Sequence, residues 1–381
     1  MKFIEDINID NKKVILRLDL NVTIKDNQIL DDTKIVKSLK TINYLLDHNC
    51  KVLIMSHLGK IKTEEDKINN SLKIVCARLC ELLGKPIVFV TTTRGKELED
   101  AFNNNDIVMM ENTRYEDLDG KKESGNDEEL AKYWASLGEV FINDAFGTTH
   151  RCHASNNGIS KYLESGYGYL IKEELDGLDP IVNNIKRPFT VIMGGAKVDD
   201  KVQLIKSLLS ECDNLLVGGG IANTFLKASG YEIGESLYSA DYIDEVKDIL
   251  NEYSSKIVLP IDVVVNNNDN ISTIDSKSVT EGAIYDLGPK TLQVYRDILD
   301  ESETIFINGT IGLYEDERYN KGTIELFNIL RRCNNIKIAG GGDAVASINT
   351  LGYQDAFNYL STGGGATLEY IADKKLKCFE E

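Results

Sequence analysis

The sequence contains no run of roughly 18 consecutive apolar residues, which is the length that a membrane-spanning helix requires. Its first residues, MKFIEDINIDNKK, also lack the apolar core of a secretory signal. We therefore expect a cytoplasmic protein that is neither exported nor inserted in a membrane.

Basic residues are scarce relative to acidic ones: 43 Lys and Arg stand against 61 Asp and Glu, a net charge of −18. Nucleic-acid binding normally needs a basic surface, so the composition argues against a nucleic-acid partner. An anionic substrate would have to be held by a local cluster of basic side chains, because the field of the whole chain repels it.

The seven cysteines form no recognisable framework, because their number is odd and their spacing irregular. They are Cys50, Cys76, Cys80, Cys152, Cys212, Cys333 and Cys378. Cys76 and Cys80 lie in a helical pattern, SLKIVCARLCELLG, in which both would face the core. We predict buried structural thiols in a reducing compartment rather than disulfides or a metal site.

Short apolar runs alternate with amphipathic helical segments along most of the chain, which indicates parallel sheets built from strand–helix–strand units. The runs are VILRLDLNV, KVLIMSHLG, IVFVTTT, DIVMMENTR, EVFINDAFG, FTVIMGGAK, NLLVGGG, KIVLPIDVVV, TIFINGTIG, IKIAGGGDA and YLSTGGG. Eleven strands exceed one ordinary open sheet, so we predict an α/β fold with two doubly wound, Rossmann-like domains. The predicted parts are a first domain over 1–167, a hinge helix within 168–188 that ends near Pro180, a second domain over 189–365, and a C-terminal segment over 366–381.

Polar residues follow the strands of the first half, where ligands of parallel sheets bind. In VILRLDLNV, Arg17, Asp19 and Asn21 share one face. Two interpretations are open: an internal salt bridge between Arg17 and Asp19, or a functional polar set at the end of the strand. The first half also places His57, Lys60, Asn112, Arg114, Asn143, Asp144, His150, Arg151 and His153 just after strands. This chemistry suits a phosphate and a carboxylate; a metal bound by His150 and His153 is a weaker alternative, because no third ligand is evident.

Glycine-rich turns follow four strands of the second half. MGGAKVDDK is not a Walker A sequence, but it carries Lys197 and Lys201, which would share a helix face. VGGGIANTFLK, IAGGGDAV and LSTGGGAT each add a Gly triplet. Such turns let backbone N–H groups approach an anion, so the set predicts a polyphosphate site. Asp343 could be a helix N-cap or a Mg²⁺ ligand, and Asp262 could be structural.

These segments together resemble the phosphoglycerate kinase family over essentially the whole chain and in the same order. The resemblance is carried by RLDLNV, DDTKI, SHLGK, MENTRY, NDAFGTTHR, GYLIKEEL, GGAKVDDK, GGGIANTFLK, DLGPKT, NGTIGLYE, GGGD and STGGGAT. It implies a cytoplasmic, usually monomeric, hinge-bending kinase of glycolysis. The first domain would bind 3-phosphoglycerate or 1,3-bisphosphoglycerate, and the second would bind ADP or ATP with Mg²⁺. The reaction would move the acyl phosphate of 1,3-bisphosphoglycerate to ADP.

The resemblance also implies roles for single residues. Substrate would be bound by Asp19, Asn21, Lys34, His57, Lys60, Arg114 and Arg151. Nucleotide would be bound by Lys197, Lys201, Gly219, Gly288, Asn308, Leu313, Glu315, Gly341, Gly342, Asp343 and Ala344, with Asp343 holding the metal. The transferring group would be met by Lys34, Lys201, Gly342 and Gly365.

Several residues depart from the family's pattern. Lys34 and Lys60 stand where the family usually has Arg, Thr23 replaces a Pro, and Ile307 replaces a Trp. Thr310-Ile311 replaces Pro-Met, and the ending LKCFEE differs from the one that folds back on the first domain. A non-catalytic descendant that binds nucleotide or metabolite is therefore an alternative. A nicotinamide dehydrogenase is not favoured, because no GxGxxG follows the first strand with an acid about 20 residues on.

Overall fold

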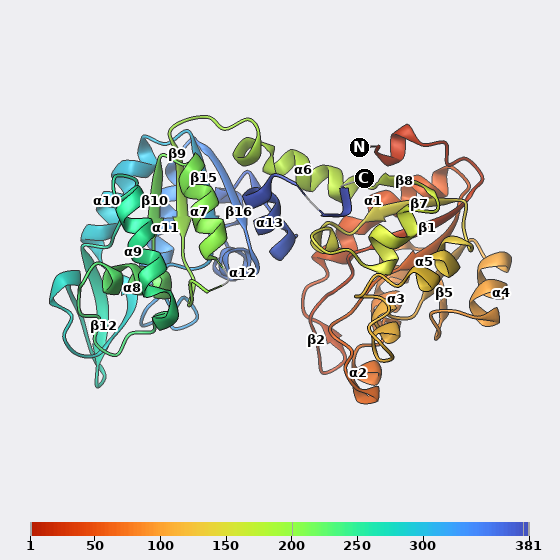
Figure 1. The fold of residues 1–381 in the computed structure, drawn as a ribbon, viewed down its shortest axis with the longest axis horizontal. Coiled ribbons are helices and arrows are strands. Elements are labelled where there is room, and N and C mark those ends of the chain that lie inside the picture. The colour runs from red at the N-terminus through yellow and green to blue at the C-terminus, as the bar shows by residue number, and fades with distance from the viewer. Residues whose placement is uncertain (1, 200, 376, 380–381) are drawn as a thin grey trace. The chain divides into compact units, whose positions relative to one another are not determined.

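The computed structural model describes residues 2–199, 201–375 and 377–379 (Figure 1). The chain forms two compact units, one of Met1–Leu175 with Leu376–Glu381 and the other of Asp176–Lys375. Among the described residues, no helix is long and apolar enough to cross a membrane.

The first unit is built on a six-stranded parallel sheet in the order β5-β6-β4-β1-β7-β8. The strands are β1 (Lys13–Leu18), β4 (Lys51–Met55), β5 (Val88–Val90), β6 (Ile107–Met110), β7 (Val140–Asp144) and β8 (Glu164–Tyr167). The helices are α1 (Thr33–Asp47), α2 (Glu64–Asn69), α3 (Lys73–Leu83), α4 (Lys96–Asn104) and α5 (Glu128–Ala135), and a hairpin joins β2 (Ile24–Lys25) to β3 (Gln28–Ile29).

Strand β1 shows why this sheet has two buried faces. Val14 and Leu16 pack with α1 and α3 in one core cluster, while Ile15 packs with α4 and α5 in another. Alternate side chains of a strand point to opposite faces, so Arg17 lies on the face of Ile15. Strand β1 therefore carries one buried guanidinium, Arg17, among the buried apolar side chains of Val14–Leu18.

The second unit has a parallel sheet in the order β11-β10-β9-β15-β16-β17, the arrangement of a doubly wound fold. Its strands are β9 (Phe189–Met193), β10 (Asn214–Val217), β11 (Ile257–Val258), β15 (Thr304–Asn308), β16 (Ile336–Gly340) and β17 (Tyr359–Leu360). Its helices are α7 (Val202–Glu211), α8 (Gly219–Ala228), α9 (Ile243–Tyr253), α10 (Pro289–Asp300), α11 (Lys321–Arg332), α12 (Gly342–Leu351) and α13 (Gly365–Asp373). An antiparallel sheet of β12 (Asp262–Asn267), β13 (Asn270–Asp275) and β14 (Ala283–Leu287) is added.

The predicted α/β class with parallel sheets is confirmed, with differences in individual elements. The run KIVLPIDVVV is two strands, because Pro260 separates β11 of the parallel sheet from β12 of the antiparallel one. Proline has no N–H to donate to a ladder, which explains the break. The short strands β2, β3, β8 and β13 were not predicted. The helix within 168–188 is α6 (Tyr169–Val182), which contains Pro180 and ends two residues after it.

The cysteine prediction holds in part. Cys50, Cys76, Cys212 and Cys378 are buried, and Cys80 and Cys333 are partly buried. Cys152 is exposed, contrary to the prediction, because it follows Arg151 in a surface loop rather than a strand or helix. All seven thiols are free.

Candidate active site

In the first unit, the residues that follow β1 lie at the centre of the sheet, because β1 pairs with β4 on one side and β7 on the other. Asp19 is nearly buried, and its Oδ2 lies 2.9 Å from Nζ of Lys34 in the first turn of α1. Asn21 accepts a hydrogen bond of 2.9 Å from the N–H of Gly59, just after β4. The segment after β1 and the first turn of α1 thus place Asp19, Asn21 and Lys34 together, and the loop after β4 holds Asn21.

Arg17 does not form the internal salt bridge with Asp19 that was one of the two interpretations. Its Nε donates to Oγ of Ser155 at 2.8 Å, and its Nη2 lies 3.2 Å from Nδ1 of His57. Asp19 pairs with Lys34 instead. The alternative of an Arg17–Asp19 salt bridge is therefore wrong, and the polar set at the strand end is the arrangement observed.

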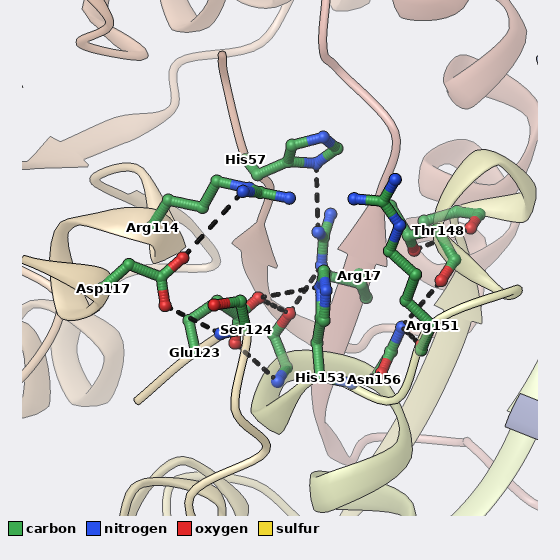
Figure 2. A network of polar contacts seen from close by, with 12 residues as sticks. Arg17, His57, Arg114, Asp117, Glu123, Ser124, Thr148, Arg151, His153 and Asn156 are labelled. Atoms are coloured by element: carbon green, nitrogen blue, oxygen red, sulfur yellow. Dashed lines mark hydrogen bonds and ion pairs between the residues drawn. The ribbon is translucent and has the colours of Figure 1, made fainter. Parts of the chain in front are cut away.

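Cationic side chains converge around His57 (Figure 2). Figure 2 shows its imidazole above Arg17, between the guanidinium groups of Arg114 and Arg151. Nε of Arg114 is buried and has no hydrogen-bond partner among the described residues, and the acid nearest to its Nη1, Asp117, is 3.9 Å away. A buried donor without a partner is costly, and an anion from solution would satisfy it.

The electrostatics of this cluster disfavour the protonated forms of His57 and His153. Burial, followed by the positive charges of Arg17 and Arg114, holds the pKa of His57 well below its usual value. The same causes lower the pKa of His153 to about 3. Nε of Arg151 donates to Nε2 of His150 at 2.9 Å, so that nitrogen is an acceptor already in use. Within the described ranges, no group of three or more His, Cys, Asp and Glu side chains could hold a metal ion. The alternative of a metal bound by His150 and His153 therefore still lacks a third ligand.

The second unit contains a cavity of about 500 Å³ at the carboxyl ends of its parallel strands. Its lining includes Gly195 and Ala196 after β9, Gly219 and Gly220 at the start of α8, Leu313 and Glu315 after β15, and Asp343 of α12. Apolar walls come from Leu237, Val263, Ile284, Leu287 and Ile311. Such a pocket, with an apolar wall beside polar and acidic side chains, suits a flat organic ring next to a polar group.

The glycine-rich turns around this cavity are joined by backbone hydrogen bonds. Gly195 donates to the carbonyl of Thr310 at 2.8 Å, and Gly219 donates to that of Ile311 at 2.8 Å. Gly219 has φ +60°, and a Cβ there would lie 2.9 Å from the carbonyl oxygens of Gly195 and Thr310. Only glycine fits, so the close approach of these loops depends on the Gly pattern.

The two predicted lysines are not on one helix face. Helix α7 begins at Val202, so Lys197 lies in the preceding loop and Lys201 is the N-cap residue. The residues after β9 form an open turn in which Gly195 has φ +119°. Lys201 is buried and its Nζ donates to the carbonyl of Gly194 at 2.9 Å, while Lys197 is exposed.

Asp343 is not an N-cap. The N-cap of α12 is Gly341, and Asp343 lies in the first turn, exposed on the cavity. A carboxylate in the first turn is favoured by the helix dipole, and it leaves its oxygens available to a ligand. Asp262 is structural: its carboxylate accepts from the N–H groups of Lys290 and Thr291 at the start of α10.

Comparison with known proteins agrees with this geometry. A profile described as phosphoglycerate kinase matches residues 4–374. The chain is 47% identical to the phosphoglycerate kinase of Fusobacterium nucleatum and 46% identical to that of Enterococcus faecalis, in each case over 98% of this chain and 97% of the relative. The structure of phosphoglycerate kinase from Coxiella burnetii superposes with a TM-score of 0.86 at 34% identity, covering 98% of this chain and 97% of that one.

The chain belongs to the phosphoglycerate kinase family. It is accordingly a phosphotransferase of glycolysis that acts on a phosphoglycerate and a nucleotide. The resemblance seen in the sequence is thereby confirmed, and the alternative of a non-catalytic descendant gains no support.

The other expected nucleotide residues of this phosphoglycerate kinase are not among the residues that line the cavity. Nδ2 of Asn308 donates to the carbonyl of Gly340 at 2.7 Å, and Gly341 packs against that amide. Gly342 is exposed at the start of α12, with Ala344 buried behind it. Gly288 caps α10 beside Asp262, and Gly365 is the exposed first residue of α13. Lys60 is exposed after β4.

Two buried carboxylates at these sites were not predicted. Asp286 lines the cavity and accepts from the N–H groups of Leu287 at 2.9 Å and Gly322 at 2.6 Å. Burial raises the pKa of Asp286 to about 7. Glu123, with no exposed surface, accepts from Ser155 in the first unit. The signal for Asp286 was the DLGP turn; Glu123 lies in a charged loop, KKESGNDEE, that gives none.

Proposed function

We propose that the first unit binds the phosphoglycerate through the basic cluster at the carboxyl ends of β1, β4, β6 and β7. The buried Nε of Arg114 without a partner among the described residues is the observation that carries this proposal. Arg114 and Arg151 would bind the phosphate, because guanidinium groups form paired hydrogen bonds with oxyanions. Asp19 and Asn21 would orient the hydroxyl and carboxyl groups of the glycerate.

The second unit would bind the nucleotide, with the base in the cavity between Leu313 and the apolar wall and the ribose near Glu315. The phosphates would then follow the glycine-rich turns toward Lys197, Lys201 and the N-terminus of α12. Asp343 fits a Mg²⁺ ion, because this ion takes oxygen ligands and is commonly held by one or two carboxylates together with substrate phosphates. The metal would neutralise charge on the phosphates.

The chemistry of the transfer needs positioning and charge stabilisation rather than a covalent intermediate. Lys201, buried and held by Gly194, would meet the equatorial oxygens of the phosphoryl group from the nucleotide unit. Lys34, at the edge of the basic cluster, would meet them from the phosphoglycerate unit. Because donor and acceptor must be in line and in reach, we propose that turnover includes a hinge motion. We also propose that the enzyme acts as a cytoplasmic monomer.

A coupled assay with 3-phosphoglycerate and MgATP tests this proposal, with the variants Arg114→Ala and Asp343→Asn beside the parent. We expect the Arg114 variant to raise KM for 3-phosphoglycerate and to leave KM for MgATP unchanged. Asp343→Asn should weaken binding of MgADP more than of metal-free ADP in calorimetry. Equal losses with and without Mg²⁺ would show that Asp343 serves only the helix. No effect of Arg114 on the phosphoglycerate would contradict the assignment of the first unit.

A further inference from the structure

The buried guanidinium of Arg17 has no carboxylate in direct contact among the described residues, although it lies under the anion site. Its side chain is 0% exposed. Burial lowers the pKa of Arg17, while the charges of Glu123 and Asp19 raise it. Asp19 is paired with Lys34 at 2.9 Å, so Glu123 is the acid left to balance Arg17.

Ser155 connects the two groups. Both oxygens of Glu123 accept from Ser155, Oε1 from the hydroxyl and Oε2 from the backbone N–H at 2.9 Å. The hydroxyl has one proton, and with that proton directed to Glu123 its oxygen accepts the 2.8 Å bond from Nε of Arg17. The relay of donors then runs from the guanidinium to the hydroxyl to the carboxyl group, with Oε1 of Glu123 as the last acceptor.

The other end of Arg17 determines the state of His57. A guanidinium only donates, so Nη2 of Arg17, 3.2 Å from Nδ1 of His57, requires that nitrogen to be an unprotonated acceptor. Because Nδ1 accepts, His57 is then the neutral tautomer with its proton on Nε2. Its remaining N–H can donate to an anion, which is what the site needs.

The loop that carries Glu123 is fixed from both sides. The carbonyl of Glu123 accepts from Ala154 at 2.9 Å, which ties the loop to the turn that bears Ser155. Asp127 closes the loop by capping α5, where it accepts from Leu130 at 2.9 Å. The carboxylate is therefore held in position before any ligand binds.

We propose that Glu123 is a positioning residue for the phosphoglycerate site, which acts through Ser155 and Arg17 to fix the Nε2–H tautomer of His57. This inference rests on the proposed assignment of the basic cluster to the phosphoglycerate. Glu123 touches neither substrate nor reacting atoms, so its loss weakens the binding of 3-phosphoglycerate and spares the chemical step and the nucleotide.

The test uses Glu123→Gln, which keeps the shape and removes one acceptor and the charge. We expect KM for 3-phosphoglycerate to rise about ten- to hundredfold, because a buried network is left with an unsatisfied donor. KM for MgATP and kcat should stay within about threefold of the parent. The matched control is Glu116→Gln: Glu116 is also buried and accepts from the Thr93 hydroxyl at 2.5 Å, but it pairs with Arg94 after the edge strand β5. It should leave both KM values unchanged.

A second variant and a spectroscopic readout keep the test decisive if Glu123→Gln does not fold. Ser155→Ala breaks the relay and leaves the acid in place, so it should raise KM for 3-phosphoglycerate in the same way. Imidazole ¹⁵N NMR of the four histidines, assigned for His57 by His57→Gln, should show the Nε2–H tautomer in the parent and a mixture in Ser155→Ala. An Nδ1–H tautomer in the parent would overturn the inference.

Arg114→Ala separates the two proposals. If it raises KM for 3-phosphoglycerate while the soluble variants at Glu123 and Ser155 leave KM unchanged, the site assignment stands and the positioning role is overturned. If Arg114→Ala also leaves KM unchanged, the site assignment fails and the inference fails with it.

Discussion

Lys201 is the residue whose removal should affect the chemical step most. It is buried, its Nζ donates to the carbonyl of Gly194 at 2.9 Å, and the same Nζ lies beside Gly195 of the glycine-rich turn. One preorganised charge at a transition state is worth about 10²–10³-fold in rate, so we expect Lys201→Ala to lower kcat by that factor. Circular dichroism checks that the variant is folded. Lys197→Ala, exposed in the same loop, should mainly raise KM for MgATP. A Lys201→Ala enzyme with kcat within about threefold of the parent would contradict the role.

Lys34 and Lys60 test whether lysine limits this enzyme. A lysine supplies a point charge, whereas arginine supplies a planar fork that matches phosphate and carboxylate. We expect Lys34→Arg to raise kcat and Lys60→Arg to lower KM for 3-phosphoglycerate in steady-state kinetics. The outcome at position 34 depends on Asp19, which holds Nζ at 2.9 Å. A fall in kcat in the Lys34 variant would show that the pair with Asp19 has adapted to lysine.

The sequence predicts a charged site residue when that residue lies at the end of an apolar strand. It does not predict a site residue that comes from a polar loop. Arg17 and Arg114 follow apolar runs, so their burial near one another followed from the parallel sheet. Glu123 lies among the acids and lysines of a loop that looks solvated, and only the tertiary contact with Ser155 identifies it. Asp286 differs in that the DLGP turn is a signal for it, but its partner Gly322 lies 36 positions along the chain and only the structure identifies that contact.

At the scale of elements, Asp144 determines where α6 begins. It ends β7, and its Oδ1 accepts from the N–H groups of Leu170 at 2.8 Å and Ile171 at 3.1 Å. Its Oδ2 accepts from the hydroxyl of Thr41 on α1 at 2.5 Å. The carboxylate of Asp144, which lies on strand β7, thus accepts the first free N–H groups of α6 in the way that an N-cap side chain would.

The same carboxylate should make the stability of the first unit depend on pH. Burial raises the pKa of Asp144 to about 6, above the value of about 3.9 in an unfolded chain. The folded state therefore favours the protonated form, so this contribution is full below about pH 4 and is lost as the pH rises to about 6. The loss is about 3 kcal/mol at most.

Asp144→Asn removes this titration and leaves an oxygen to accept from the helix. Urea unfolding followed by Trp134, the single tryptophan and a buried residue of the first unit, measures the effect. We expect the unfolding free energy of the parent, relative to that of the variant, to decrease from about pH 4 to about pH 6. A constant difference across that range would contradict the titration of Asp144.

Elements were predictable where apolar runs and turns agree, as in the two parallel sheets. Strand β13 of the antiparallel sheet was not, because it is mostly exposed and carries no apolar run. The shared face expected for Lys197 and Lys201 was wrong because the spacing of four residues has this meaning only within a helix, and α7 begins after both.

At the scale of the whole molecule, the chain passes between the two units twice, through α6 and again after α13. The ending departs from the family's pattern, yet residues 377–379 contact the first unit. The N–H of Cys378 donates to the carbonyl of Thr149 at 3.0 Å, its Sγ donates to that of Arg151 at 3.1 Å, and its own carbonyl accepts from the hydroxyl of Tyr167 at 3.3 Å. The two contacts made by the backbone of Cys378 do not depend on which side chains the ending has, whereas the contact with Arg151 uses the thiol.

The loop that Cys378 contacts is the one that presents Arg151 to the anion site. Arg151 is exposed, and the hydrogen bond to His150 is the one that the structure gives its guanidinium within the described residues. The position of the loop therefore depends on the hydrogen bonds of its backbone.

A chain that stops after Lys375 loses the hydrogen bonds to Thr149 and Arg151. We expect it to keep its affinity for ADP in calorimetry, because the nucleotide cavity is lined by residues of the second unit alone. KM for 3-phosphoglycerate should rise about tenfold, as expected when two hydrogen bonds that fix a binding loop are lost. Cys378→Ser, which keeps the backbone bond to Thr149, should fall between the truncated and full chains. Loss of ADP affinity on truncation, or an unchanged KM for 3-phosphoglycerate, would show that the ending does not act through this loop.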